Sequence, residues 1–258
     1  MYLAKSIAAT GLRNQQNRLD VIANNVANAN TVAFKSPRLD FKDALYTWGV
    51  TPGPPRNPEM NQQRGHGVMI AGIGRDWRTG SFERTERATD FAIQGEGFFT
   101  LSNPDGGVLY TRNGSFHLSA EAGGNFLVNG EGLYVLDTNG ARITIPVGVS
   151  TINVGEDGTL EFRIGDNLVG GATLNIATFR NIGGLESVGQ SNFAHTPSAG
   201  EILPARNAVI RQGILEGSNI NLAEEMTRLI RTQRAFQLSS RALTTADDME
   251  GIANNMRR

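Results

Sequence analysis

The chain of 258 residues contains no cysteine, and this absence removes several kinds of chemistry at once. Without thiols it forms no disulfide, no thiolate metal site and no cysteine nucleophile. Its three histidines, His66, His117 and His195, lie far apart in the sequence and share no metal-ligand spacing. We therefore expect no metal site, no cofactor site and no catalytic residue built from these side chains.

The sequence also lacks a strong excess of charge and any long apolar run. Its 24 basic and 25 acidic residues give a formal net charge of -1, which offers no electrostatic reason to expect nucleic acid as a partner. No segment approaches the roughly 18 apolar residues that span a bilayer, so membrane insertion is not expected. Lys5 is followed by no continuous apolar stretch, so a cleavable secretion signal is not expected either.

Glycine is plentiful, with 31 residues, but no nucleotide-binding glycine motif is present. The glycine-rich segment 65–74 does not fit G-x-G-x-x-G, and no phosphate-binding G-x-x-x-x-G-K-[ST] occurs. The acidic residues between positions 83 and 90 alternate with arginines, a pattern typical of a solvated surface strip. We therefore expect a protein that is not an enzyme.

Two long amphipathic segments occupy the ends of the chain, at residues 3–30 and 221–256. Apolar residues recur in them at three-, four- and seven-residue steps, the spacing of paired helices. Asn221 followed by Glu224 has the spacing of a capping box and predicts where the second helix begins. The candidate interface residues are Leu12, Leu19, Ile22, Asn24, Asn25, Val26, Asn28, Leu222, Met226, Leu229, Ile230, Gln233, Phe236 and Leu243. Two ordinary core helices of a globular domain are the alternative interpretation.

Residues 23–28, Ala-Asn-Asn-Val-Ala-Asn, are unusual for a helix because asparagine is a mediocre helix former. Asn24 and Asn28 lie four residues apart and so share one helical face. Amides beside an apolar stripe can fix the register between neighbouring helices. Alternatively, these residues are solvated and weaken the helix near its end, where Asn30 would adopt a left-handed cap.

Proline is scarce, with nine residues, yet four of them fall between positions 52 and 58. Four glycines follow, at positions 65, 67, 72 and 74. Prolines stiffen a chain and glycines loosen it, so this segment is predicted to be a linker or an extended arm. A disordered loop is the alternative.

From Asp90 to about Arg211 the sequence predicts β-structure. Short alternating apolar runs are separated by Asp-Gly or Asn-Gly at positions 105–106, 113–114, 129–130, 139–140 and 157–158. These dipeptides favour the positive φ angles of tight hairpin turns, although the pair at 113–114 fits a turn within a longer connection equally well. We expect a compact, mostly antiparallel domain that can fold alone.

Motifs at both ends and in the middle resemble those of bacterial flagellar basal-body rod and hook proteins. Residues 11–31 followed by Phe34-Lys35 resemble the N-terminal signature of that family. Residues 216–221, 224–226 and 232–236 resemble its C-terminal motif, and residues 91–99 and 110–116 match its middle. One departure is Ala33, where the family usually has glycine. A left-handed turn at this position would be strained with alanine.

The resemblance implies an α+β fold, in which N- and C-terminal helices pair as a coiled-coil-like domain around an inserted, mostly antiparallel β domain. Residues 1–35 and 217–258 would form the terminal helical domain of an inner tube. Residues 36–75 would form a Pro/Gly-rich extended arm or linker. Residues 76–216 would form a β-rich outer domain.

The same resemblance implies a structural subunit of the flagellar rod, which polymerises helically through its terminal helices into a torque-transmitting drive shaft. The arm suggests the distal-rod type. The alternatives are a proximal-rod or hook-basal-body subunit of the same family, and a monomeric binding module or enzyme.

The implied partners are copies of itself, other rod and hook subunits, the flagellar type III export apparatus and surrounding ring or bushing proteins. Nucleic acid, membrane insertion and cofactors are not implied. The implied location is the flagellar basal body in the cell envelope and periplasm, reached without a cleavable signal peptide.

Overall fold

The computed structural model describes residues 2–45, 47–48, 63–103, 106–121, 124–205 and 207–256, which form two compact units. The first unit contains Met1–Ala27, Pro37–Arg75 and Asn221–Arg258, and the second contains Asn28–Ser36 and Asp76–Ile220. The prolines at positions 52, 54, 55 and 58 lie outside the described residues. Helices at both ends and a mostly antiparallel β domain between them confirm the α+β class.

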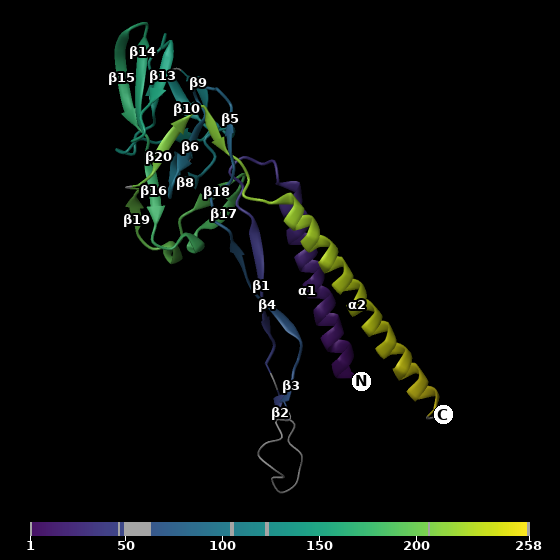
Figure 1. The fold of residues 1–258 in the computed structure, drawn as a ribbon. Coiled ribbons are helices and arrows are strands. Elements are labelled where there is room, and N and C mark those ends of the chain that lie inside the picture. The colour runs from purple at the N-terminus through teal and green to yellow at the C-terminus, as the bar shows by residue number, and fades with distance from the viewer. Residues whose placement is uncertain are drawn as a thin grey trace. The chain divides into compact units, whose positions relative to one another are not determined.

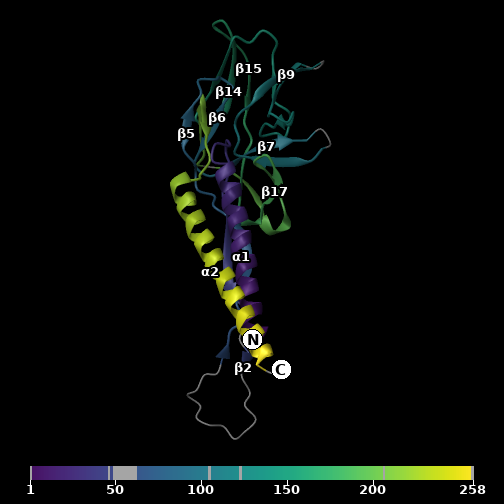
Figure 2. The same ribbon diagram turned by 90° about the vertical axis from the view of Figure 1, so that its right-hand side faces the viewer.

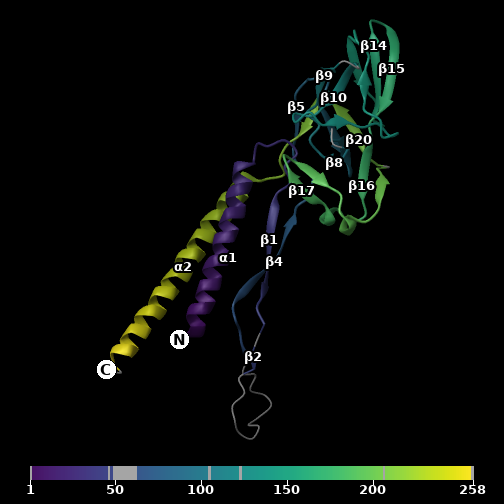
Figure 3. The ribbon, with the colours of Figure 1, turned by 180° about the vertical axis from the view of Figure 1, so that it is seen from behind.

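The first unit is built on two long helices, α1 (Tyr2–Ala27) and α2 (Leu222–Asn255). They run antiparallel and lie side by side in all three ribbon views (Figures 1, 2 and 3). The Asn221 side chain accepts from the backbone N–H groups of Ala223 and Glu224, as a helix cap should. The second hydrogen bond of the predicted capping box, from the backbone N–H of Asn221 to the Glu224 carboxylate, is replaced. The Glu224 carboxylate accepts from Arg228 instead.

An antiparallel ribbon completes the first unit. It consists of β1 (Pro37–Asp43) and β4 (Val68–Arg75), and a shorter pair follows in β2 (Thr47–Trp48) and β3 (Gln63–Arg64). The Asn14 side chain of α1 donates to the carbonyl of Val68, which ties the ribbon to the helix. The sequence analysis assigned no strand here. Half-buried and exposed residues alternate along β1, which is the two-residue period of a strand. The sequence analysis missed this period.

The second unit is a β domain, in which every described strand pairing is antiparallel. Its first strands are β5 (Phe82–Arg84), β6 (Phe91–Gln94), β7 (Phe98–Ser102), β8 (Val108–Thr111), β9 (His117–Glu121), β10 (Gly124–Val128), β11 (Tyr134–Val135) and β12 (Thr144–Ile145). The remaining strands are β13 (Thr151–Val154), β14 (Thr159–Ile164), β15 (Asn167–Thr173), β16 (Ile176–Phe179), β17 (Glu186–Gly189), β18 (Asn192–Ala194), β19 (Ile202–Pro204), β20 (Val209–Gln212) and β21 (Ile214–Glu216). Two short 3-10 helices, η1 (Ile182–Gly184) and η2 (Pro197–Ala199), lie between them.

The strands of this unit form one large sheet and several small ones. The large sheet has the path β12-β10-β11-β7-β8-β18-β17, with β9, β16 and β19 paired beside that path. A three-stranded sheet, β13-β14-β15, and the pairs β6–β20 and β5–β21 complete the domain. The turns at 129–130, 139–140 and 157–158 connect paired segments, as the sequence predicted.

The Asn113-Gly114 turn does not close a hairpin, because β8 pairs with β7 and β18 whereas β9 pairs with β10. The alternative interpretation of a turn within a longer connection is therefore correct. Glycine is required here because a Cβ atom on Gly114 would lie 1.7 Å from the carbonyl oxygen of Phe91. Close backbone approach, rather than hairpin geometry, explains this glycine.

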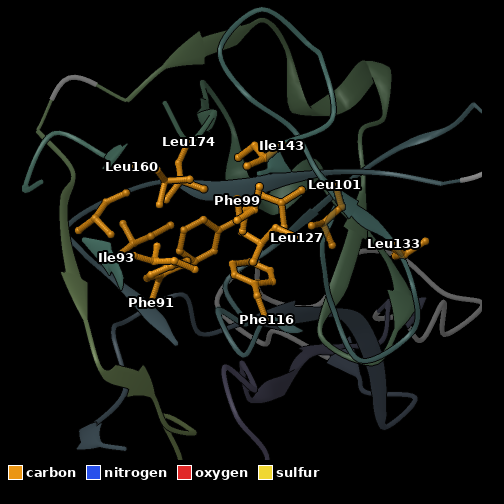
Figure 4. Packing of buried hydrophobic residues seen from close by; sticks show 14 of the residues in the cluster. Phe91, Ile93, Phe99, Leu101, Phe116, Leu127, Leu133, Ile143, Leu160 and Leu174 are labelled. Atoms are coloured by element: carbon orange, nitrogen blue, oxygen red, sulfur yellow. The ribbon is translucent and has the colours of Figure 1, made fainter. Parts of the chain in front are cut away.

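The core of the β domain gathers aromatic and aliphatic side chains from strands distant in sequence. Figure 4 shows Phe91, Phe99 and Phe116 at its centre, and the rings of Phe99 and Phe116 meet edge to face at 5.3 Å. Burial of each such side chain stabilises the fold by about 1.5 to 3 kcal/mol. A second cluster, around Phe98, packs on another part of the same unit. The β domain therefore has a core of its own.

Candidate assembly surface

The side of α2 that packs on α1 carries polar and small residues among half-buried apolar ones. Glu225 and Thr232 are buried on it, and the Thr232 hydroxyl donates to the carbonyl of Arg228 one turn earlier. Gly11 of α1 approaches α2 closely, since a Cβ atom there would lie 3.9 Å from the Ser239 hydroxyl. The small residues Gly11 and Ser239 allow the two helices to approach each other at this point.

Much of the predicted apolar stripe on α2 is left uncovered within the unit. Leu222, Met226 and Ile230 are 47%, 43% and 50% exposed. Gln233 is exposed as well, while the remaining members are half-buried, namely Leu229, Phe236 and Leu243. The structure therefore places Leu222, Met226 and Ile230 beside the contact with α1, whereas half-buried Leu229, Phe236 and Leu243 share the helical face of Glu225 and Thr232.

The predicted interface residues of α1 are more deeply buried than those of α2. Ile22 is buried, and Leu12, Leu19 and Val26 are half-buried. Asn24 is exposed on α1. Asn28 belongs to the second unit, where its side chain accepts from the Thr31 hydroxyl at 3.1 Å.

Asn25 joins three elements of the first unit. Its side-chain amide donates to the carbonyl of Pro37 on β1 at 3.3 Å and to the Glu225 carboxylate on α2 at 3.5 Å. Glu225 also accepts from Arg228 at 2.8 Å, so a buried carboxylate is satisfied from two sides. The sequence analysis emphasised the face of Asn24 and Asn28 and missed Glu225. An acidic residue in the first turn of a helix is normally explained by its favourable interaction with the helix dipole. The burial of Glu225 against α1 was therefore not predicted.

Lys5 fixes the register of the helices at their other end. Its ammonium group forms ion pairs with Asp247 and with Glu250, the latter at 2.6 Å. The hydrogen bonds that Lys5 donates to these carboxylates raise the pKa of Lys5 above its usual value. Lys5 at one end and Asn25 at the other therefore align α1 with α2 along their shared length.

A buried ionic cluster of Lys35, Arg112 and Glu216 lies in the second unit. The Glu216 carboxylate accepts from Lys35 at 2.6 Å, from Arg112 at 2.9 Å and from the backbone N–H of Gly80 at 3.1 Å. Arg112 donates in addition to the carbonyls of Ile93, Gly95 and Gly97. Burial lowers the pKa of Lys35 despite its carboxylate partner. All three charges belong to the motifs that carried the sequence resemblance, and they connect the segment after α1 to β8 and β21.

Ala33 has the left-handed backbone that the sequence analysis considered unfavourable for alanine. Its φ angle is 56°, its side chain is fully buried, and its N–H donates to the carbonyl of Glu216 at 2.7 Å. The left-handed residue after α1 is thus Ala33, and the expectation of a left-handed cap at Asn30 is wrong. The hydrogen bond to Glu216 holds this conformation against its steric cost.

The described residues show no arrangement suited to metal chemistry. Within the described ranges, no group of three or more His, Asp or Glu side chains is placed to hold a metal ion. None of the helices in that part of the chain is both long enough and apolar enough to cross a membrane. The surface with the clearest unused binding capacity is the uncovered apolar stripe of α2.

Comparison with known proteins gives matches along most of the chain. The model for flagella basal body rod proteins matches residues 6–35, and the D1-domain model of the flagellar hook protein FlgE/F/G matches residues 92–162. The C-terminal model of the flagellar basal body rod FlgEFG proteins matches residues 211–256. These three segments contain most of α1, all of α2 and part of the β domain.

Full-length relatives give the same result. The chain is 36% identical over 264 residues to the flagellar basal-body rod protein FlgG of Borreliella burgdorferi, covering 97% of each chain. It is 33% identical over 259 residues to FlgG of Bacillus subtilis, covering 96% of this chain and 97% of the relative. It is also 32% identical over 266 residues to the flagellar hook-basal body complex protein FlhP of Bacillus subtilis, covering 97% of each chain.

Proposed function

This chain belongs to the flagellar basal-body rod protein family, and from that premise we propose that it builds the rod by polymerising through its two terminal helices. It is a structural subunit of the bacterial flagellar rod. The observation that carries the proposal is the half-exposed state of Leu222, Met226 and Ile230 on a helix that already has one partner in α1.

The physical driving force is burial of apolar surface between copies. Each large aliphatic side chain that leaves water contributes about 1.5 to 3 kcal/mol, and the contribution recurs in every subunit. A contact between unlike surfaces of two copies does not close on itself, so it extends into a helical filament. Leu229, Phe236 and Leu243, half-buried beside the exposed row, would be covered further as the same contact forms.

The finer features of assembly belong to the same proposal. Residues 1–27 and 221–258 form the inner tube with coiled-coil-like packing, residues 28–36 and 76–220 form an outer domain, and residues 37–75 form an arm. The full-length similarity to FlgG proteins supports the distal-rod type over the proximal type. The subunit acts mechanically, transmitting torque, rather than as an enzyme.

Its partners and location follow from the same premise. The chain assembles with copies of itself and with other rod and hook subunits, passes through the flagellar type III export apparatus, and lies inside surrounding ring or bushing proteins. It resides in the flagellar basal body within the cell envelope, and no cleavable signal peptide is needed for this route. The relative named as a hook-basal body complex protein supports neighbours of this class.

The test is a double substitution, Met226→Asp with Ile230→Asp, in the purified chain. Both side chains are about half exposed, so the monomer should fold normally, while two carboxylates in the subunit contact should abolish polymerisation. Sedimentation measures the polymer, and near-ultraviolet circular dichroism checks the β domain. Val169→Asp on β15, at a similarly exposed position outside the helices, is the matched control and should polymerise like the parent chain. Normal polymerisation of the double variant would contradict the proposal.

A further inference from the structure

The last part of the β domain in the sequence, residues 209–220, contacts the first strands of that domain. β20 pairs with β6 and lies beside it in Figure 1, and β21 pairs with β5. In the described part of the chain, neither β5 nor β6 has another strand partner. We call residues 209–220 the closing segment. It follows β19 in the chain and leads directly into α2.

Through β6 the closing segment affects the centre of the core. β6 carries Phe91 and Ile93, which are 0% and 1% exposed and belong to the main core cluster (Figure 4). Three of the four residues of β6 are buried, and β20 is the strand that pairs with them. A buried backbone N–H or C=O group without a partner is strongly unfavourable. β6 therefore needs β20 in order to stay in its buried position.

The side chain of Gln212 on β20 bonds to two other parts of the domain. It donates to the carbonyl of Ala88, which follows β5, at 2.7 Å and to the carbonyl of Ile152 on β13 at 2.6 Å. It also accepts from the backbone N–H of Val154 on β13 at 3.3 Å. On the same strand, Ile210 is 2% exposed and packs in the main core cluster. β20 therefore contributes to the core and connects β6 to the three-stranded sheet.

The second half of the closing segment is in contact with the chain that follows α1. The Asn219 side chain accepts from the backbone N–H of Ser36 at 2.9 Å and donates to the carbonyl of Asp76 at 2.7 Å. A Cβ atom on Gly80 would lie 2.1 Å from the carbonyl oxygen of Gly217, so the two backbones are in direct contact. This half of the segment therefore joins the chain after α1 to the chain before β5.

The closing segment also supplies the carboxylate of the buried ionic cluster. Lys35 and Arg112 are 1% and 5% exposed, and the Glu216 carboxylate contacts both of them. The carbonyl groups bonded to Arg112 accept its hydrogen bonds but do not neutralise its charge. Without Glu216 the domain would bury two neighbouring cations without the carboxylate between them, and this strongly disfavours the closed domain.

We propose that the β domain stays open until the closing segment docks, and that Glu216 completes the closure by neutralising the buried cations. Lys35 and Arg112 lie 181 and 104 positions before Glu216 in the chain, so both are synthesised long before the carboxylate that they need. A chain that stops short of Glu216 therefore has no closed β domain. Only a complete chain presents a folded β domain together with α2. This property belongs to the β domain itself and is independent of polymerisation.

Pulsed amide exchange during refolding of the full chain tests the order of closure. The chain is unfolded in urea and diluted, and amide protection is followed in β6, β7, β8, β20 and β21. We expect protection of all five strands to appear in one kinetic phase, and Glu216→Gln should delay them together. Protection of β7 and β8 before β20, or a delay confined to β20 and β21, would overturn the proposal, because the domain would then close without the segment.

Variants of the full chain test whether Glu216 acts through its charge. Glu216→Gln should lower the equilibrium constant for folding of the β domain by roughly a hundredfold or more, because it leaves Lys35 and Arg112 without their carboxylate. Lys35→Met in the Glu216→Gln background should recover part of this loss, since it removes one of the two cations. Glu161→Gln on β14, an exposed carboxylate paired with Arg163, is the matched control and should change the constant by less than about threefold.

Urea titration followed by near-ultraviolet circular dichroism measures these folding constants. An effect of Glu216→Gln no larger than that of Glu161→Gln would contradict the role of Glu216. So would a double variant, Glu216→Gln with Lys35→Met, that is no more stable than Glu216→Gln alone. If Glu216→Gln is too unstable to measure, a folded fraction in the double variant supports the proposal, and the absence of one counts against it.

Discussion

At the scale of single residues, the short segment after α1 contains both an unfavourable backbone conformation and a buried charge. Ala33 adopts a left-handed conformation, and two residues later Lys35 carries a charge into the interior of the β domain. Both are held by Glu216, through its backbone carbonyl for Ala33 and through its carboxylate for Lys35. A buried charge is tolerated only when it is paired and hydrogen-bonded, and this cluster meets that condition with four backbone carbonyls as further acceptors.

Ala33→Val should destabilise the second unit by about 2 to 4 kcal/mol, while Ala33→Gly should change its stability by less than about 1 kcal/mol. A branched side chain in the left-handed region adds steric cost, and the buried site has no room for more methyl groups. Glycine relieves the backbone but loses a buried methyl group, so its effects nearly cancel. Urea denaturation measures both variants.

Ala172→Val on β15 is the control for this pair, because a strand accepts branched side chains. Equal tolerance of valine at positions 33 and 172 would show that the left-handed conformation is not required.

At the scale of elements, α2 contacts α1 along one side, so this 34-residue helix still has exposed apolar side chains. The side that meets α1 carries buried Glu225 and Thr232 among half-buried apolar side chains, and that contact is aligned by the ion pairs of Lys5 and the hydrogen bonds of Asn25. Polar contacts specify register without consuming apolar surface. The helix pair is therefore aligned before assembly and still has the exposed apolar side chains of α2 available for neighbours.

Lys5→Met should loosen the ends of the two helices without unfolding them. The ammonium group is partly exposed and forms both ion pairs, so its loss removes the alignment at that end while the methionine keeps most of the apolar stem. We expect faster amide exchange in residues 2–10 and 243–255 and unchanged exchange around Asn25. Because solvent screens such pairs, high salt should produce part of the same change in the parent chain.

Arg13→Met is the matched control, since Arg13 is exposed and forms no ion pair in the described structure. Equal exchange rates in the parent chain and Lys5→Met would mean that the ion pairs do not align the helices.

At the scale of the whole molecule, the second unit is not one continuous stretch of chain. Residues 28–36 belong to it, although they follow α1 directly and are separated from the rest of the unit by the ribbon. The N–H of Asp76 donates to the carbonyl of Ser36 at 2.9 Å, so the two parts meet side by side. The β domain therefore depends on a segment that sequence reasoning assigned to the helical end.

A fragment of residues 76–220 should be less stable than the same fragment fused, through a short glycine linker, to residues 28–36. The shorter fragment lacks Lys35 and leaves Arg112 and Glu216 without one member of their buried cluster, a loss of about 3 to 5 kcal/mol. Thermal unfolding of the two fragments measures the difference. As a control, the fused fragment with Lys35→Met should behave like the shorter one. Equal stability of all three would show that the segment contributes nothing to this fold.

The sequence by itself determined the α+β class, the position of both terminal helices, most hairpin turns and the family. These features depend on local patterns, namely heptad spacing, the Asn221 cap and Asn-Gly or Asp-Gly turns, which short-range physics specifies. The resemblance to that family, which usually has glycine at this position, also pointed to backbone strain at Ala33.

Tertiary structure alone decided which side of α2 meets α1, that Asn25 and not Asn24 bonds to Glu225, and that β1 pairs with β4 across a long intervening segment. It also decided that Lys35, Arg112 and Glu216 form one cluster. Helical periodicity shows that an apolar stripe exists, but the partner that covers it depends on side-chain volumes and on hydrogen bonds between residues up to 200 positions apart. No local pattern contains that information, because the free energy of each such contact depends on both partners at once.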